Sequence, residues 1–314
     1  MEKQSKIFLA GHHGLVGSAI HRELTKNGFY NVITKAHSEL DLTRQEAVER
    51  FFKDEKPEYV ILSAGRVGGI GANSKYPADF YYINTMIAAN VIHSAFKFDV
   101  KKLLYLGSSC IYPRLAKQPI LENELLSGSL EATNEGYALA KIGGLKMCDF
   151  YRDQYGCNFI SAMPTSIYGI NDNFDLFSSH LIPALIRKFH EAKTHNENKV
   201  VIWGTGTPFR ELMYADDLAN ALLFLMENYN EKGHINVGTG EDYTIMDYAK
   251  KIKKIVGFTG ELVNDLQMPD GVFRKRLDVT KLYRMGWRPK TSINEGLRIV
   301  YEWFTKNYTS IVKN

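Results

Sequence analysis

A glycine-rich turn directly after the first apolar segment constrains the fold of this chain more than any other feature. The apolar run 7–10 leads into a G-x-x-G-x-x-G loop, and an amphipathic stretch over 18–27 follows it. Glycines at this spacing let backbone amides approach a pyrophosphate, and the N-terminus of the next helix favours its negative charge. An isolated glycine triplet fits a tight turn equally well, but a position between a strand and a helix favours a dinucleotide-binding loop. The loop consists of Gly11, His12, His13, Gly14, Leu15, Val16 and Gly17.

Short apolar runs and amphipathic stretches continue to alternate through about residue 165. Strands are expected at 7–10, 32–34, 59–62, 103–106 and 159–163, and helices at 18–27, 44–54, 77–98 and 135–154. This order predicts right-handed βαβ units in a Rossmann-type, doubly wound parallel sheet. The rhythm is less regular after Tyr168, where 171–177 is loop-like and further elements are expected at 182–192, 200–203, 215–227, 235–237, 245–256 and 293–307. The predicted fold class is α/β, with a smaller mixed α/β C-terminal region over the carboxyl edge of the sheet.

The end of the second predicted strand bears on the choice of cofactor. An acidic side chain there usually binds the ribose hydroxyls of NAD, whereas this strand runs into Thr34-Lys35-Ala36-His37. Lys35, His37 and His13 offer cationic groups that suit a 2′-phosphate, so we predict NADP(H). The alternative is that Lys35 is a solvated surface lysine and that Glu39 or Asp41 binds the ribose of NAD.

Two later segments carry residues typical of a carbonyl reductase centre. Ser108 follows the fourth predicted strand, and Tyr137 and Lys141 lie four residues apart on one face of a predicted helix. We expect the Lys141 ammonium to lower the pKa of the Tyr137 phenol from its ordinary value of about 10 and to bind the nicotinamide ribose. Tyr137 would then protonate a carbonyl oxygen as hydride arrives, while Ser108 polarises that oxygen. Taken alone, the pair also fits a surface tyrosine beside a lysine, and its position after the glycine loop favours the active-site interpretation.

The charge balance and the cysteines exclude several classes of partner. With 39 basic and 35 acidic residues and no basic block, the chain favours small anionic ligands over nucleic acid. Cys110, Cys148 and Cys157 lack paired metal-ligand spacing, so no metal is expected and a reducing cytoplasm fits best. The polar segment 1–6 leads into an apolar run too short for a signal peptide or a membrane span. We therefore predict a soluble cytoplasmic protein with no membrane partner.

The chain resembles the GDP-L-fucose synthase family of the extended short-chain dehydrogenase/reductases. The resemblance extends over nearly the whole chain and is most specific in the run Gly107-Ser108-Ser109-Cys110-Ile111-Tyr112-Pro113. Further matching motifs are Ala10-Gly11-His12, Val67-Gly68-Gly69-Ile70, Tyr76-Pro77-Ala78-Asp79-Phe80, Asp172-Asn173-Phe174, Ser179-His180 and Leu277-Asp278-Val279. The resemblance implies an NADP-dependent oxidoreductase that reduces the C4 ketone of a GDP-4-keto sugar and also epimerises C3 and C5.

By position, the resemblance implies Ser108, Tyr137 and Lys141 as the reductase residues and Cys110 and His180 as the epimerisation pair. A 4-ketone acidifies the protons at C3 and C5, so a thiolate base and an imidazole acid would invert these centres before reduction. Cys110 would need a lowered thiol pKa, which the cofactor's charge and His180 would favour. Without the resemblance, Cys110 fits an inert thiol and His180 an ordinary hydrogen-bonded histidine.

The remaining implied contacts belong to the cofactor and the GDP-sugar. Besides the glycine loop and the reductase residues, the expected cofactor contacts are Lys35, His37, Asp41, Leu42, Ala64, Gly65, Leu106, Gly107, Pro164, Thr165, Ser166, Ile167 and His180. The expected substrate contacts are Ser108, Cys110, Lys188, Trp203, Arg210 and Asp278. Lys188 and Arg210 suit a pyrophosphate and Trp203 suits a ring, although Arg210 in a glycine-rich turn also fits a solvated loop arginine. We assign residues 1–168, with returning segments near 199–238, to NADP binding and 169–314 mostly to the GDP-sugar.

Departures from the family pattern leave the sugar open. Ser166 stands where the family has asparagine, Gly136 where it has proline, and Val272-Phe273 where it has Thr-Pro. The last change places bulk in a segment expected beside the sugar, so a pure C4 reductase of a GDP-4-keto-heptose or related sugar is the main alternative. An NAD-dependent 4-epimerase or dehydratase and a non-enzymatic dinucleotide sensor are further alternatives.

The resemblance also implies a homodimer, in which the helix beginning near Pro77 and the helix carrying Tyr137 pack against their symmetry mates. The apolar residues of the first helix fit either such an interface or an ordinary core against the sheet. These residues are Ile83, Met86, Ile87, Val91 and Ile92.

Overall fold

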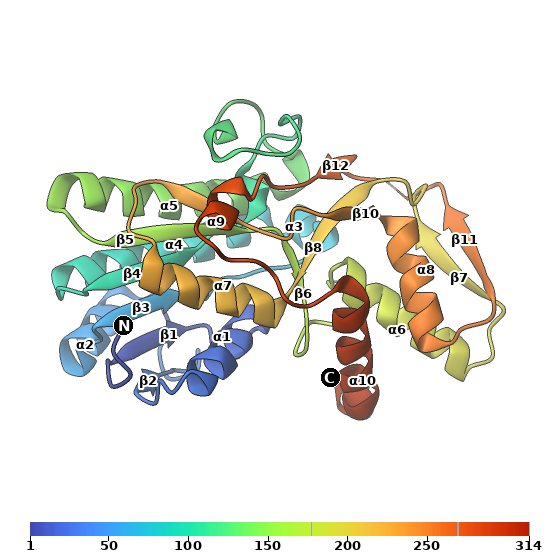
Figure 1. The fold of residues 1–314 in the computed structure, drawn as a ribbon, viewed down its shortest axis with the longest axis horizontal. Helices are drawn as coiled ribbons and strands as arrows, with labels where there is room; N and C mark the ends of the chain where they lie inside the picture. The colour runs from blue at the N-terminus through green and yellow to red at the C-terminus, as the bar shows by residue number, and fades with distance from the viewer. Residues whose placement is uncertain (177, 269, 314) are drawn as a thin grey trace.

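Six parallel strands form the centre of the larger part of the molecule (Figure 1). The structure is a computed structural model that describes residues 1–176, 178–268 and 270–313. The strand order is β2-β1-β3-β4-β5-β9, and each neighbouring pair is parallel. Most of these strands are apolar and buried along their length, as expected for a parallel sheet covered by helices. They are β1 (Ile7–Ala10), β2 (Val32–Ile33), β3 (Tyr59–Leu62), β4 (Lys102–Leu106), β5 (Phe159–Pro164) and β9 (His234–Val237).

Helices cover both faces of this sheet and fix the place of its ligand crevice. One face carries α1 (Leu15–Lys26) and α7 (Ala215–Asn228), and the other carries α2 (Gln45–Glu55), α4 (Pro77–Lys97) and α5 (Glu135–Tyr155). From β1 the chain goes to β2 on one side and then crosses to β3 on the other, so the strand order reverses between β1 and β3. Ligands of doubly wound sheets bind outside the carboxyl ends of the strands at such a reversal, which is where the glycine loop begins.

The C-terminal part consists of small sheets and three longer helices, at the right of Figure 1. Thr165 alone separates β5 from β6, so this part begins at the carboxyl ends of the large sheet. One small sheet has the order β10-β8-β12 with β6 also on β8, and β7 pairs with β11 in another. Within 199–238, α7 and β9 return to the large sheet, whereas β7 does not. The bounds are β6 (Ser166–Tyr168), β7 (Lys199–Trp203), β8 (Phe209–Tyr214), β10 (Asp242–Thr244), β11 (Glu261–Asp265), β12 (Arg274–Lys275), α6 (Leu181–Thr194), α8 (Ile245–Val256) and α10 (Ile293–Lys313), with short helices α3 (Ile70–Lys75) and α9 (Thr280–Arg284) and 3₁₀ turns η1 (Ser109–Ile111), η2 (Glu122–Glu124) and η3 (Ala132–Asn134).

The predicted fold class is confirmed, and the bounds of some predicted elements differ from those in the structure. The strand at 59–62 and the helix at 245–256 have the predicted bounds. Helix α1 begins at Leu15 rather than at 18, so Gly17 lies inside the helix, where a Cβ would overlap the Gly11 carbonyl. The predicted loop 171–177 is irregular through 176, and Phe177 lies outside the described residues. Among the described residues, no helix has the length and apolar character needed to cross a membrane.

Candidate active site

The glycine loop has the geometry of an anion-binding turn at the start of α1. Gly11 adopts a left-handed conformation with φ 92°, and a Cβ there would lie 2.7 Å from the Ala64 backbone. Gly14 is the N-cap of α1, and no side chain caps the first turn. The first amide groups of α1 therefore favour an anion through the helix dipole. The predicted pyrophosphate loop and Ala64 lie together, and their geometry fits a dinucleotide.

Cationic side chains gather after β2, where an adenosine ribose is expected. Lys35 is half-buried, and the exposed His37 has its Nδ1 3.9 Å from the Asp41 carboxylate. Asp41 accepts hydrogen bonds from the Thr43 amide at 2.9 Å and the Thr43 hydroxyl at 2.7 Å, and these bonds hold the pKa of Asp41 below its ordinary value. Arg44, which the sequence argument did not use, places its Nε 3.7 Å from Asp41. The Glu39 carboxylate accepts a hydrogen bond from the Ala36 amide at 2.7 Å, so both acids of this segment make their hydrogen bonds within their own turns.

Lys141 is buried where β3, β4 and α5 meet. Its Nζ donates a hydrogen bond to the Leu106 carbonyl at 2.9 Å, and a Cβ at Gly65 would lie 3.6 Å from the same nitrogen. Asn84 of α4 supports this turn, because its Oδ1 accepts from the Arg66 amide and its Nδ2 donates to the Arg66 carbonyl, each at 3.0 Å. Burial lowers the pKa of Lys141 to about 8. The structure brings the predicted residues Gly65, Leu106 and Lys141 together and adds Asn84 as their support.

Tyr137 lies one helical turn before Lys141, whose Nζ is 5.8 Å from the centre of the phenol ring. Burial raises the pKa of Tyr137 above its ordinary value, the Cys110 thiol adds to this rise, and the Ser108 hydroxyl opposes it. The expected lowering by Lys141 is not found in the protein alone, because burial dominates and the ammonium donates to the Leu106 carbonyl. At neutral pH the phenol is therefore protonated and able to donate.

Cys110 belongs to the same cluster. The Ser108 Oγ accepts a hydrogen bond from the Cys110 amide at 3.3 Å, which starts the η1 turn after β4. The Cys110 Sγ accepts a hydrogen bond from the Asn134 Nδ2 at 3.6 Å, and the thiol affects the pKa values of Tyr137 and Lys141. Four of the predicted catalytic residues thus gather beyond the carboxyl end of β4.

His180 approaches from the C-terminal part of the molecule as the N-cap of α6. Solvent reaches its side chain, yet surrounding protein atoms desolvate the imidazole enough to lower its pKa. The loop around Gly69 connects it to the cluster, because a Cβ at Gly69 would lie 2.8 Å from the Ser179 carbonyl oxygen. Phe80 packs on the same loop, and its ring is 6.3 Å from that of Tyr137 in an edge-to-face arrangement.

Three of the residues predicted to bind the substrate, Lys188, Trp203 and Arg210, lie in the C-terminal part of the molecule. Lys188 of α6 donates to the Val201 carbonyl at 3.2 Å, and its Nζ lies 5.1 Å from the ring centre of Trp203, which is 52 % exposed. The Arg210 Nη1 donates to the Val272 carbonyl at 2.7 Å. Burial lowers the pKa values of Lys188 and Arg210, so both are partly desolvated cations that suit a pyrophosphate.

Asp278, which is also predicted to bind the substrate, makes hydrogen bonds to the backbone of Thr280 and Ile120. Its carboxylate accepts a hydrogen bond from the Thr280 amide at 2.9 Å at the start of α9, and its own amide donates to the Ile120 carbonyl at 2.8 Å. These contacts explain an acidic residue at this position structurally. Its role on the substrate therefore stays a prediction.

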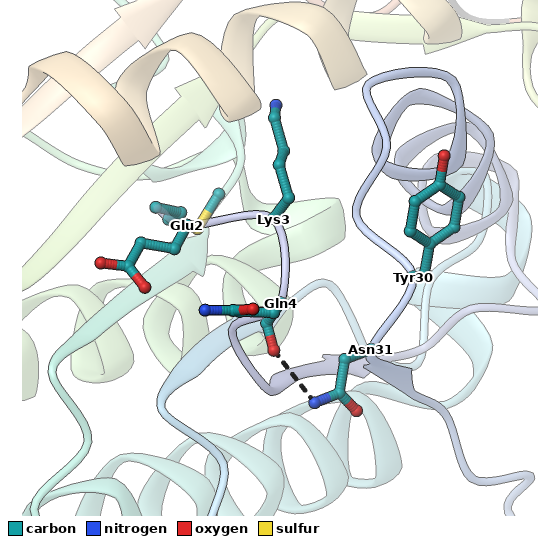
Figure 2. Close-up of a pocket in the computed structure, with 6 residues that line it drawn as sticks. Glu2, Lys3, Gln4, Tyr30 and Asn31 are labelled. Atoms are coloured by element: carbon teal, nitrogen blue, oxygen red, sulfur yellow. Dashed lines mark hydrogen bonds between the residues drawn. The ribbon is translucent and has the colours of Figure 1, made fainter.

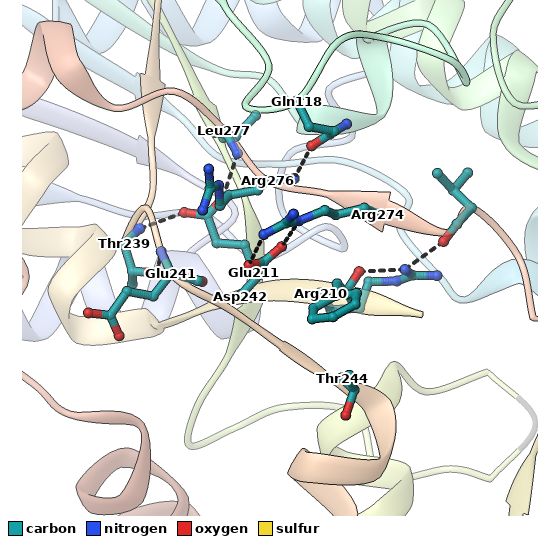
Figure 3. A network of polar contacts seen from close by, with 12 residues as sticks. Gln118, Arg210, Glu211, Thr239, Glu241, Asp242, Thr244, Arg274, Arg276 and Leu277 are labelled. Atoms are coloured by element: carbon teal, nitrogen blue, oxygen red, sulfur yellow. Dashed lines mark hydrogen bonds and ion pairs between the residues drawn. The ribbon is translucent and has the colours of Figure 1, made fainter. Parts of the chain in front are cut away.

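Glu211, next to Arg210, is a buried carboxylate that the sequence argument missed. Figure 3 shows its carboxylate accepting backbone amides, at 2.7 Å from Leu277 and from Thr239, and a further amide of Gly240 donates at 2.8 Å. Burial raises the pKa of Glu211 to about 7, against the effect of these amides. The carboxylate fastens β8 to the turn after β9 and to the segment after β12, and so fixes the backbone that carries Arg210.

An open pocket near the N-terminus lies away from this cluster. Figure 2 shows Glu2, Lys3, Gln4, Tyr30 and Asn31 around it, and the Asn31 Nδ2 donates to the Gln4 carbonyl at 3.2 Å. These residues precede β1 and β2, so the pocket lies at the amino edge of the sheet, opposite the glycine loop. Since ligands of such sheets bind at the carboxyl edge, we assign this pocket no part in the site.

The fold and the site together define the class of extended short-chain dehydrogenase/reductases. A model of the "NAD dependent epimerase/dehydratase family" matches residues 7–238. GDP-L-fucose synthase 1 of Arabidopsis thaliana is 55 % identical, with 98 % of this chain and 95 % of that protein covered. GDP-L-fucose synthase of Escherichia coli (strain K12) is 51 % identical, with 98 % of each covered. A solved GDP-mannoheptose C4 reductase from Campylobacter jejuni with NADP bound is 41 % identical, with a TM-score of 0.90 and coverage of 97 % of this chain and 99 % of that one.

The chain belongs to the NAD-dependent epimerase/dehydratase family and, within it, to the GDP-L-fucose synthase family. This confirms the resemblance found in the sequence.

Proposed function

We propose that this protein epimerises C3 and C5 of a GDP-4-keto sugar and then reduces its C4 ketone with NADPH. The observation that carries the proposal is the cluster of Ser108, Cys110, Tyr137 and Lys141 beyond β4. A reductase needs the hydroxyl, the phenol and the ammonium, and the thiol adds the base that epimerisation requires. The GDP-L-fucose synthases at 51–56 % identity support both halves of the proposal.

In the reduction step, the protein's residues control the proton. NADPH, when bound along the glycine loop, supplies the hydride. The protonated Tyr137 phenol donates to the ketone oxygen as negative charge develops there, and Ser108 donates a hydrogen bond to the same oxygen. Lys141 then stabilises the phenolate that remains, since a neighbouring cation favours the charged form.

In the epimerisation steps, two groups handle the carbon-bound protons. The ketone acidifies the protons at C3 and C5, so a thiolate at Cys110 removes a proton from one face of the carbon and leaves an enolate. An acid on the opposite face then delivers a different proton to that carbon, which inverts its configuration. We assign this acid role to His180, the N-cap residue of α6, on the basis of the resemblance. The backbone before His180 is fixed by two hydrogen bonds, from the Ser179 amide to the Asp175 carbonyl at 2.9 Å and from the Gly69 amide to the Ser178 carbonyl at 3.0 Å.

We also propose which part of the chain binds which ligand. We assign residues 1–168, together with the returning α7 and β9, to NADP and the rest of 169–314 mostly to the GDP-sugar. Lys188 and Arg210 would bind the pyrophosphate and Trp203 a ring.

A pure C4 reductase of a GDP-4-keto-heptose is the second candidate function. Phe273 is 63 % exposed, and the preceding Val272 carbonyl binds Arg210, so the departure from the family pattern borders the proposed GDP-sugar site. NADPH oxidation should be measured with GDP-4-keto-6-deoxyhexose and GDP-4-keto-heptose substrates, and the product configuration determined by NMR. Inversion at C3 and C5 of a hexose supports the main proposal, and turnover of the heptose alone without inversion supports the second.

The wild-type kcat/KM should be higher with NADPH than with NADH. Lys35→Ala should lower kcat/KM with NADPH about tenfold and should change kcat/KM with NADH little. The substitution removes one charge-assisted contact to a 2′-phosphate, worth about 1.5 kcal/mol or more. Steady-state kinetics with both cofactors measures this, and Lys26→Ala at the exposed end of α1 is the matched control. Equal or better kcat/KM of the wild type with NADH would contradict the assignment.

We also propose a homodimer formed through α4 and α5. Ile87, Val91 and Ile92 are buried against the sheet and so belong to the core. Light scattering at micromolar concentration should give twice the chain mass, and Phe150→Asp should shift the mass toward that of one chain; a single-chain mass for the wild type would contradict the dimer. The apolar side chains that these two helices expose, and that suit an interface, include Tyr81 (48 %), Tyr82 (59 %), Leu139 (44 %) and Phe150 (63 %).

We propose a location in the cytoplasm as well, because the three free thiols fit a reducing compartment.

A further inference from the structure

Asn134 directs its side chain to the Cys110 thiol instead of capping α5. It is the N-cap residue of this helix, and asparagine is among the residues that most often cap a helix through the side chain. Here no side-chain hydrogen bond caps α5, and the Asn134 Nδ2 donates to the Cys110 Sγ at 3.6 Å. The Oδ1 of the same amide is buried and has no hydrogen-bond partner among the described residues. Helix capping therefore does not account for this asparagine. Burial of an amide whose oxygen has no partner costs free energy, so the residue needs another explanation.

The groups around the thiol bear on which form of Cys110 is favoured. Lys141 and Tyr137 are the ionisable groups of α5 that interact electrostatically with Cys110, and Ser108 binds the Cys110 amide rather than the sulfur. A hydrogen bond from a neutral N–H to an anion is stronger than one to a neutral acceptor, so Asn134 favours the thiolate over the thiol. The Lys141 cation acts in the same direction, while the protonated phenol carries no charge.

We propose that Asn134 is a positioning residue that stabilises and orients the Cys110 thiolate for proton exchange at the sugar carbon beside the ketone. The inference rests on the proposed function, because the exchange is the epimerisation step. In this step the C–H bond breaks, the proton forms an S–H bond, and the electron pair moves onto the ketone oxygen as an enolate. The Nδ2 hydrogen bond stabilises the sulfur before the transfer and is weakened after it.

The thiol pKa of Cys110 tests the inference independently of turnover. Asn134→Ala removes the donor and should raise this pKa by about 1 unit, as expected for the loss of one hydrogen bond to an anion. Asn134→Asp has the same shape and caps helices as well as asparagine, but it adds a negative charge, so it should raise the pKa further. The pKa is read from the pH dependence of iodoacetamide alkylation in a Cys157→Ser background, because burial raises the pKa of Cys148 to about 12 and keeps it silent. Glu135→Gln changes an exposed charge one residue away and should leave the thiol pKa unchanged.

Deuterium incorporation from D₂O into the 4-keto sugar is the second readout. Both variants should slow it, about tenfold at neutral pH for each unit of thiol pKa, while reduction of an already epimerised ketone stays near wild-type and shows that the fold is intact. An unchanged thiol pKa in both variants, or a raised pKa with undiminished exchange, overturns the inference. A third outcome is that both variants raise the thiol pKa of Cys110 while the wild type exchanges no deuterium. This result would support the contact between Asn134 and the thiolate and would overturn the epimerase function.

Discussion

Tyr137→Phe should lower kcat for ketone reduction by about 10²–10⁴-fold, the range expected when a general acid is removed. The phenol is protonated at neutral pH because burial raises its pKa. Removing the phenol hydroxyl therefore removes the proton donor to the ketone oxygen. The Kd of NADPH should change by less than about tenfold, since at most one hydrogen bond of about 0.5–1.5 kcal/mol is lost. The rate of ketone reduction is measured by single-turnover NADPH absorbance with a pre-epimerised ketone. The Kd of NADPH is measured by fluorescence titration.

Tyr151→Phe is the matched control for this variant. Tyr151 also lies on α5, but its hydroxyl pairs with the His93 Nδ1 at 2.7 Å and lies outside the catalytic cluster. This variant should reduce the ketone at the wild-type rate. If Tyr137→Phe kept near-normal turnover, another group would have to be the acid.

The large sheet could be predicted from the sequence because its strands are short continuous apolar runs between amphipathic helices. The strands β8, β10 and β12 could not, because charged residues interrupt them: β8 contains Arg210 and Glu211, β10 begins with Asp242, and β12 consists of Arg274 and Lys275. Their register depends on contacts such as those of the Glu211 carboxylate, and nothing local marks Glu211 as buried. A buried acid with three amide partners is a tertiary feature, so periodicity does not reveal it.

The candidate site, too, could be predicted only in part from the sequence. Motif spacing was enough to place Ser108, Tyr137 and Lys141, since a strand end and a helix face bring them together. Asn84 and Asn134 escaped notice because an asparagine at the start or on one face of a helix has ordinary local explanations. Gly136 is explained only by the fold: a Cβ there would lie 2.8 Å from the Pro77 carbonyl oxygen, where α4 and α5 come close.

Cys110→Ser should lower deuterium incorporation at C3 and C5 by about 10²–10⁴-fold, because a serine hydroxyl is a far weaker base than a thiolate. The wild type, incubated with its 4-keto substrate in D₂O, should place deuterium at one or both carbons, as NMR or mass spectrometry of the product will show. Reduction of a ketone that is already epimerised should survive the substitution, since Ser108, Tyr137 and Lys141 remain. Cys157→Ser, a half-buried thiol outside the cluster, is the matched control and should exchange normally.

This experiment separates the two candidate functions at the level of chemistry. A pure C4 reductase needs the phenol, the ammonium and the serine, but no proton has to leave C3 or C5. If the wild type reduces its natural ketone without solvent deuterium at either carbon, the epimerase role of Cys110 and His180 fails. The thiol that Asn134 contacts would then shape the sugar pocket of a reductase, and Cys110→Ser would change KM for the sugar more than kcat.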